Sequence, residues 1–219
     1  MNGNRKKIMI AIVALMVVVV AGIVVYYGVN SMLYVKTEDA KVAGDIVKVS
    51  SQISGKLLEL NTDEGDTVEK DQIIGRQEMG SLGDSAIEQS LLRAPISGFI
   101  IKKQSNPGEM LTASQTVVMM IDPKQLYITA NVEETDLAKL KVGQTVDISI
   151  DEYKGEKLHG KIQSIGKAAN SAFSLLSGSS SSTFTKVVQK VPVKIAFENK
   201  ESSAGLLLGT NAVVKIHIK

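Results

Sequence analysis

The sequence predicts a mainly β protein with an N-terminal hydrophobic helix, a small β-sandwich made of two half-motifs, and a β-barrel with one short helix. Three observations support this prediction. A run of 20 apolar residues begins at Ile8, the segment after it contains one turn pattern twice, and the chain from Pro123 onward alternates apolar and polar residues. In order, the expected parts are a short N-terminal segment (1–7), a membrane-spanning helix (8–29), a lead-in segment (30–46), the sandwich (47–121) with a connector at 77–92, and the barrel (122–219).

The apolar run from Ile8 to Tyr27 is long enough to cross a bilayer. At a rise of about 1.5 Å per residue, a helix of this length spans about 30 Å, the thickness of the hydrocarbon core. Positive charges precede the run and negative charges follow it: Arg5, Lys6 and Lys7, then Glu38 and Asp39. The positive-inside rule therefore predicts a cytoplasmic N-terminus and an extracytoplasmic remainder.

A cleaved signal peptide is the alternative reading of this run. Signal peptides have a shorter apolar core that ends in a small-residue cleavage site. Here the core is longer and ends in Tyr26-Tyr27, two residues that suit the membrane interface. Although Ala21-Gly22 resembles a cleavage site, we expect an uncleaved single-pass anchor in the cell membrane.

The β-sandwich is predicted from an ungapped internal repeat. Ile53-Ser54-Gly55 followed by Gly65-Asp66 recurs as Ile96-Ser97-Gly98 followed by Gly108-Glu109, with an offset of 43 positions from Ile53 to Ile96 and from Gly65 to Gly108. Chance recurrence of glycine turns is the alternative, and the apolar residues that travel with the glycines argue against it. One copy with a single apolar face cannot bury that face alone, so two copies should interlock face to face. The candidate turn residues are Gly55, Gly65, Gly98 and Gly108.

A connector of 16 residues, Gln77 to Leu92, separates the two copies. It contains Gly80 and Gly83 and a possible helical turn near Ala86. If it formed a helical hairpin, each arm would reach about 10 Å. We therefore expect no long-range docking through this connector.

Period-two alternation predicts strands in the last part of the chain, because alternate residues of a strand share one face. A short helix is expected to begin at Glu134 or Thr135, with Leu137 and Leu140 on one face, and to stop at Gly143. A closed or nearly closed barrel is the natural packing for these strands. The alternating segments are Leu126–Val132, Val146–Ile150, Val191–Phe197 and Val214–Ile218.

One stretch, Ala168 to Thr185, interrupts this order with serines and a glycine, a composition typical of a flexible loop. Its few apolar residues have two interpretations. Either they fold back onto the barrel, or they form an exposed surface for a partner or for the membrane. These candidate partner-contact residues are Phe173, Leu175, Leu176 and Phe184.

Composition excludes several classes of site. The chain has no cysteine, so disulfides, thiolate metal sites and cysteine nucleophiles are ruled out. Its two histidines have no ligand partner at short spacing, and turn chemistry accounts for the acidic groups near Asp63 and Glu133. We therefore assign no catalytic residue, no cofactor and no metal. The net charge is +2, three positive charges lie in the N-terminal segment, and the nearly neutral remainder lacks the basic stripe of a nucleic-acid binder.

Several motifs, taken in order, carry a resemblance to a known family. They are the N-terminal apolar helix, Thr37-Glu-Asp-Ala-x-Val-x-Gly-Asp45, the paired Ile-Ser-Gly half-motifs, Val132-Glu-Glu-Thr-Asp-Leu137, Gly143-Gln144 and Val191-Pro-Val-Lys-Ile195. Together they resemble the membrane fusion proteins, the HlyD/EmrA type of efflux adaptor, over nearly the whole chain. No single motif is specific, but their order is.

The resemblance implies a lipoyl-like barrel-sandwich hybrid from the two half-motifs, a β-barrel after it, and no catalysis. It also implies a multi-span membrane transporter as partner, of the major-facilitator or ABC type, and a homo-oligomeric adaptor. Two departures stand out: the long helical hairpin between the half-motifs is replaced by the short connector, and the Leu-x-x-Gly-Met motif reads Leu206-Leu-Leu-Gly-Thr210. The first departure removes the family's outer-membrane docking tip and favours a cell envelope with one membrane.

Three other functions compete with the adaptor. A lipoyl or biotinyl carrier needs a lysine at the turn between the copies, but Arg76 is the one basic residue between Ile74 and Leu92. An anchored enzyme lacks a marked catalytic grouping. An anchored envelope sensor or cell-wall-binding surface protein keeps the same fold and stays open, and a neighbouring gene for a multi-span transporter would favour the adaptor over it.

Overall fold

The computed structural model describes residues 3–78, 84–151, 158–174, 188–199 and 205–218. Over these residues the chain forms two compact units, each described by itself below. Unit 1 comprises Met1–Ala40, Ala130–Ile195 and Ala212–Lys219, and unit 2 comprises Lys41–Thr129 and Ala196–Asn211.

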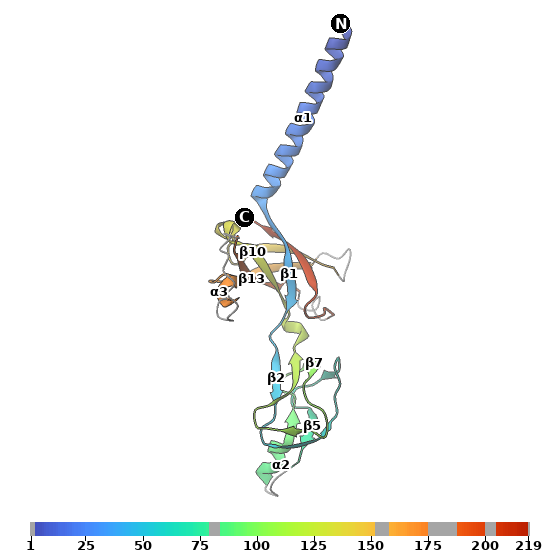
Figure 1. Ribbon diagram of the computed structural model, residues 1–219, viewed down its shortest axis with the longest axis vertical. Coiled ribbons are helices and arrows are strands. Elements are labelled where there is room, and N and C mark those ends of the chain that lie inside the picture. The colour runs from blue at the N-terminus through green and yellow to red at the C-terminus, as the bar shows by residue number, and fades with distance from the viewer. Residues whose placement is uncertain (1–2, 79–83, 152–157, 175–187, 200–204, 219) are drawn as a thin grey trace. The chain divides into compact units, whose positions relative to one another are not determined.

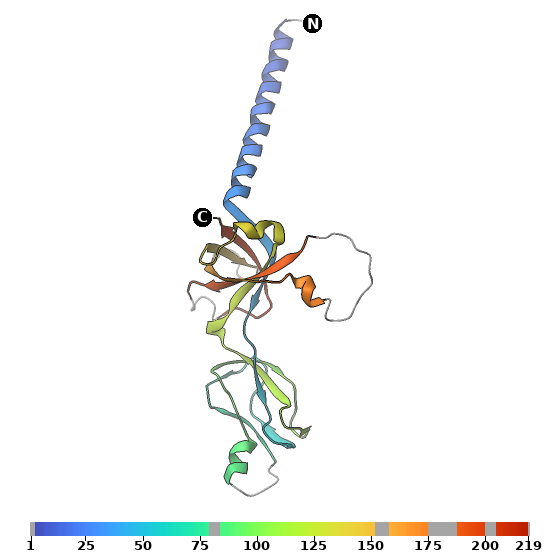
Figure 2. The same cartoon turned by 90° about the vertical axis from the view of Figure 1, so that its left-hand side faces the viewer.

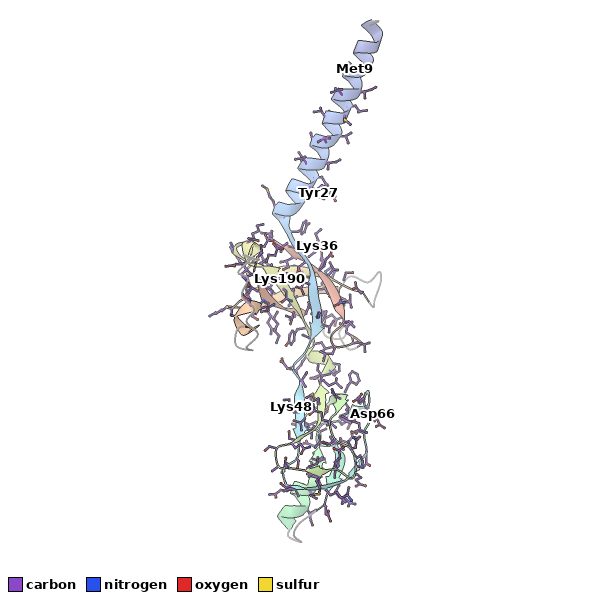
Figure 3. The ribbon with its side chains drawn as sticks, viewed as in Figure 1. Met9, Tyr27, Lys36, Lys48, Asp66 and Lys190 are labelled. Atoms are coloured by element: carbon purple, nitrogen blue, oxygen red, sulfur yellow. The ribbon has the colours of Figure 1, made fainter. Side chains whose placement is uncertain are left out.

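The first helix, α1 (Gly3–Leu33), contains 31 residues and includes the whole apolar run. Its described apolar side chains stand exposed around the helix, from Met9 at 54% to Tyr27 at 68% (Figure 3). Across the residues whose side chains are described, no helix combines the length and the hydropathy of a membrane span. The membrane anchor stays a prediction.

Six strands close into a barrel in the order β1-β10-β13-β12-β11-β14. Figure 1 shows β1, β10 and β13 of this barrel. The predicted alternation is present: in β13 and β14 every second side chain is buried, including Val193, Ile195 and Val214. The predicted β-barrel is therefore confirmed. Its strands are β1 (Tyr34–Ala43), β10 (Tyr127–Glu133), β11 (Thr145–Ile150), β12 (Leu158–Ile165), β13 (Lys190–Phe197) and β14 (Asn211–His217).

Short helices punctuate the strands. The one expected near Glu134 is a 3-10 helix, η2 (Glu134–Lys139), which ends where the Leu140 N–H donates to the carbonyl of Leu137. Gly143, in the turn that follows, has φ +91. The others are η1 (Pro123–Gln125), α2 (Asp84–Ser90) in the connector and α3 (Asn170–Ser174) in the serine-rich stretch. Figure 2 shows α2 at one end of unit 2.

Unit 2 contains two four-stranded sheets, β2-β9-β7-β4 and β6-β5-β3-β8. Each sheet borrows a short strand from the other copy of the repeat: β4 pairs with β7, and β8 pairs with β3. The predicted interlocked barrel-sandwich hybrid is therefore confirmed. Its strands are β2 (Val47–Ser50), β3 (Gly55–Leu60), β4 (Thr67–Val68), β5 (Ile73–Gln77), β6 (Leu91–Arg93), β7 (Gly98–Lys103), β8 (Met110–Leu111) and β9 (Thr116–Ile121).

The core of this sandwich contains residues of both copies. Leu57 and Ile100 are equivalent residues of the repeat, and each is no more than 1% exposed. Ile74 and Val117 are a second equivalent pair, both fully buried. Burial of these aliphatic side chains, at about 1.5–3 kcal/mol each, is the main force that holds the two copies together.

Candidate functional site

The four turn glycines of the repeat fall into two kinds. Gly65 and Gly108 have φ +94 and +96, a backbone region that glycine enters freely and other residues enter at a cost. Each donates its N–H to a carbonyl of the other copy, Gly65 to Ile100 at 2.8 Å and Gly108 to Leu57 at 2.7 Å. These two turns are therefore part of the interlock between the copies.

Gly55 and Gly98 are needed for space instead. A Cβ at Gly55 would lie 2.7 Å from the carbonyl oxygen of Glu78, and a Cβ at Gly98 would lie 2.0 Å from that of Ile121. Any side chain at Gly98 would force the backbone of β9 away from β7. The repeat therefore specifies two close approaches of backbone as well as two left-handed turns.

A buried polar pair joins the residue directly after β2 to the last residue of β5. The Ser51 hydroxyl lies 2.8 Å from Gln77 Oε1 and also donates to the carbonyl of Ile53, and both polar residues are at most 3% exposed. Their equivalents in the second copy are apolar, Ala94 and Met120. Sequence reasoning missed this pair, because nothing local marks Ser51 or Gln77 as buried.

An apolar groove lies on the outer face of β7 and β9. Its volume is about 790 Å³, within the range of small-molecule sites. Phe99, Ile101 and Met119 of the two strands are half-buried here, outside the sandwich core, and Lys102 is the one charged residue among the described residues that line it. Further lining residues are Ile46 and the segment Gly205–Leu208.

Unit 1 has a polar cleft of about 540 Å³ beside the lead-in strand β1. At its centre the Asp39 carboxylate accepts from Lys190 Nζ at 2.7 Å and from Asn131 Nδ2 at 3.0 Å. Lys36 and Lys190, both labelled in Figure 3, line the cleft. The Thr37–Asp45 motif thus places Asp39, one of its three acidic residues, in a hydrogen-bonded cluster of the barrel wall.

Both histidines of the chain contact one carboxylate on the barrel. Asp147 Oδ1 lies 3.2 Å from His159 Nδ1, and Asp147 Oδ2 lies 2.9 Å from His217 Nε2. Burial raises the pKa of Asp147, but the hydrogen bonds and charges of His217 and His159 outweigh it and leave the pKa below its ordinary value. No group of three possible ligand side chains in the described residues is placed to hold a metal ion. In the sequence neither histidine has a ligand partner at short spacing, and nothing there reveals that β11, β12 and β14 bring both of them to Asp147.

The predicted partner-contact residues are largely beyond what the structure describes. Phe173 lies in α3. Leu175, Leu176 and Phe184 lie outside the described residues. Their role as a partner contact stays a prediction.

Comparison with protein families matches both units. Residues 45–123 match the barrel-sandwich hybrid domain of RND membrane fusion proteins, and residues 126–216 match the YknX-like beta-barrel domain. The two matches follow each other along the chain.

Comparison with curated proteins gives relatives in efflux systems. The chain is 38% identical over 188 residues to YhbJ of Bacillus subtilis, named as a putative efflux system component, and the alignment covers 85% of this chain and 81% of YhbJ. It is 27% identical over 135 residues to the multidrug export protein EmrA of Escherichia coli, covering 60% of this chain. The chain spans 35% of the length of that EmrA.

Solved structures share the fold. The periplasmic adaptor protein EmrA superposes with a TM-score of 0.60 at 14% identity, covering 85% of this chain and 99% of that chain. The membrane fusion protein Spr0693 from Streptococcus pneumoniae superposes with a TM-score of 0.61 at 17% identity, with the same coverage.

Proposed function

Because this chain belongs to the membrane fusion proteins, the adaptors of efflux systems, we propose that it binds the extracytoplasmic face of a multi-span membrane transporter and assists substrate export. The observation that carries the proposal is the alignment with YhbJ, which extends over most of both chains. The proposed partner is a transporter of the major-facilitator or ABC type, and the proposed adaptor is a homo-oligomer.

We further propose that α1 anchors the adaptor in the cell membrane with its N-terminus in the cytoplasm. The helix is continuous over 31 residues, its described apolar side chains are exposed, and basic residues precede them. Exposed apolar side chains on all sides of a helix suit a lipid surrounding better than water. The β-structured remainder would then lie outside the membrane.

Co-purification tests the adaptor role. The full chain, tagged at its C-terminus, is extracted in mild detergent from its own cells, and the proteins that accompany it are identified by mass spectrometry. Enrichment of one multi-span transporter is the expected result. Recovery of wall enzymes or a signalling protein with no transporter would instead support the alternative of an anchored envelope sensor or cell-wall-binding surface protein.

The serine-rich stretch offers a second test of the same partnership. We propose that Phe173, Leu175, Leu176 and Phe184 contact the partner. Deletion of Ser174–Ser182 should then lower the yield of co-purified transporter while the barrel stays folded. A deletion variant that keeps full transporter recovery would remove Leu175 and Leu176 from the interface and leave the adaptor role intact.

A further inference from the structure

The internal repeat supplies its own control for the outer face of unit 2. Because the copies are related by a fixed offset, each strand residue of the groove has a counterpart in an equivalent strand of the other sheet. Phe99, Ile101 and Met119 correspond to Lys56, Leu58 and Arg76. The same backbone framework therefore carries an apolar outer face in one sheet and a mostly charged one in the other.

The contrast is sharpest at one cross-strand pair. In both sheets the pairing shifts by a bulge at the equivalent point, which sets Glu59 opposite Arg76 and Lys102 opposite Met119. In the first copy the two side chains form an ion pair, with Arg76 Nε 3.4 Å from Glu59 Oε1. In the second copy the charged partner is replaced by methionine, and Lys102 makes no ion pair within the described part of the chain.

The apolar face is also not fully covered by the protein itself. The segment Gly205–Leu208 approaches it, and Leu206 is buried at 7% exposed. Leu207 nevertheless stays 60% exposed, and Ile46 at the same groove stays 47% exposed. Packing within unit 2 therefore leaves a hollow of about 790 Å³ lined by hydrocarbon.

We propose that this groove binds an amphipathic anion. The hydrocarbon part lies against Phe99, Met119 and Leu206, and the acid group meets the ammonium of Lys102. A lysine without an ion-pair partner among the described residues, set among apolar side chains, is complementary to a ligand that combines both properties. A charge-assisted hydrogen bond would fix the orientation of that ligand. A second copy related by a two-fold axis fits less well, because a hollow facing the same hollow leaves both unfilled.

As a statement about the exported substrate, this inference rests on the proposed adaptor function. Binding of an amphipathic anion in the groove does not depend on that function. An efflux adaptor with such a groove would hold an amphipathic organic acid, such as an aliphatic carboxylate, on the outer side of the membrane.

Contact quenching of a single tryptophan tests the binding. The chain has no tryptophan, so Phe99→Trp places one reporter in the groove of the full-length protein in lipid nanodiscs, and Lys56→Trp places a matched reporter at the equivalent position of the other copy. The probe is undecanoate brominated at its terminal carbon, whose bromine quenches tryptophan on contact. We expect saturable quenching of the Phe99→Trp reporter and weak, non-saturating quenching of the Lys56→Trp reporter.

Loss of the lysine charge and reversal of the probe charge test the role of Lys102. Adding Lys102→Met to the Phe99→Trp protein should raise the half-saturating concentration about tenfold, as expected for loss of a charge-assisted hydrogen bond. The same change at Lys70, an exposed residue that is not among those lining the groove, should leave it unchanged. A trimethylammonium compound with the same brominated tail should quench weakly.

Four outcomes would overturn the proposal. Equal quenching of the Phe99→Trp and Lys56→Trp reporters would show that the probe partitions into lipid without binding the groove. Equal quenching by the cationic and anionic probes would show that the groove does not require a negative charge on its ligand. A third outcome combines two results: the groove binds no carboxylate, and Ile101→Asn changes the oligomeric state while the matched Leu58→Asn does not. That outcome would show that the groove contacts another copy of the chain. Transporter co-purification is measured separately, so loss of ligand binding with full transporter recovery would sink this inference and spare the adaptor role.

Discussion

Glycines of the repeat differ in how much a methyl group at each would cost. Gly98→Ala should destabilise the sandwich by at least about 3 kcal/mol, because its Cβ meets the Ile121 carbonyl. Gly108→Ala should cost about 1–2 kcal/mol, because the cost there is left-handed backbone strain with open space around the Cβ. Hydrogen exchange of β5 and β9 measures both losses. Equal losses would mean that the close approach at Gly98 relaxes freely.

Asp147 should make the stability of the barrel fall at acid pH. A pKa held below its ordinary value stabilises the fold at neutral pH, and this stability is lost as the pH falls through the folded-state pKa, below about pH 4. Asp147→Asn should therefore cost about 0.5–1 kcal/mol at neutral pH and almost nothing in acid. Urea unfolding followed by circular dichroism at both pH values measures the difference. The control is Asp151→Asn, at an exposed residue directly after β11; if it shows the same pH dependence, the histidine contacts are not the cause.

Sequence reasoning reached the residues with a conformational role and missed those whose role depends on assembly. Glycines at fixed spacing predicted the turns at Gly65 and Gly108, because turn geometry is local, whereas Gly55 and Gly98, expected in turns as well, begin strands. The contacts of Asp147 with His159 and His217 were out of reach, since they join residues 12 and 70 positions apart. The ion pair between Arg76 and Glu59, and the absence of an equivalent pair at Lys102, could be predicted only with knowledge of the register of the bulged strands.

At the scale of elements, the buried Ser51–Gln77 pair of the first copy can be replaced by the equivalent residues of the second copy, alanine and methionine. The single variant Ser51→Ala should cost about 1–3 kcal/mol, because it leaves the buried Gln77 amide short of a partner. The double variant Ser51→Ala with Gln77→Met, which copies Ala94 and Met120, should recover most of that loss. A double-mutant cycle read by hydrogen exchange of β5 checks this. Additive losses would show that the two side chains act independently.

Elements with strong periodicity were predictable, and very short ones were not. The alternating segments predicted four barrel strands, β10, β11, β13 and β14, but β1 lies in the segment expected as a lead-in and β12 lies outside the alternating segments. The strands β4 and β8 contain two residues each and exist because the other copy pairs with them. The expected helix at Glu134 is a 3-10 helix, a form that suits a single short turn between strands.

The orientation of the whole chain is open to direct chemical test. The chain has no cysteine, so Asn2→Cys and Lys124→Cys each introduce one thiol. With the proposed anchor, a membrane-impermeant maleimide added to intact cells should label the cysteine at position 124. It should label the cysteine at position 2 only after the cells are permeabilised. Labelling of both in intact cells, or release of the protein as a species shortened at its N-terminus, would contradict the uncleaved anchor.

The mainly β fold, with a barrel-sandwich hybrid and a closed barrel, was predictable because repeats and alternation are patterns that extend along the chain. The groove was not, since it depends on Gly205–Leu208 approaching strands that lie far earlier in the sequence. Cavities of this kind form where distant segments meet, and composition carries no trace of them.

The position of the connector has a consequence for descent and for engineering. The connector leaves from β5 and returns through β6, which are already paired with each other at Arg76 and Leu91. Lengthening a loop closed by such a pair costs little, about 0.6 kcal/mol for each doubling. The connector is therefore a site that tolerates insertions and deletions. An arm, a reporter or a binding module could be inserted or lost there in a single step without a change in the surrounding fold.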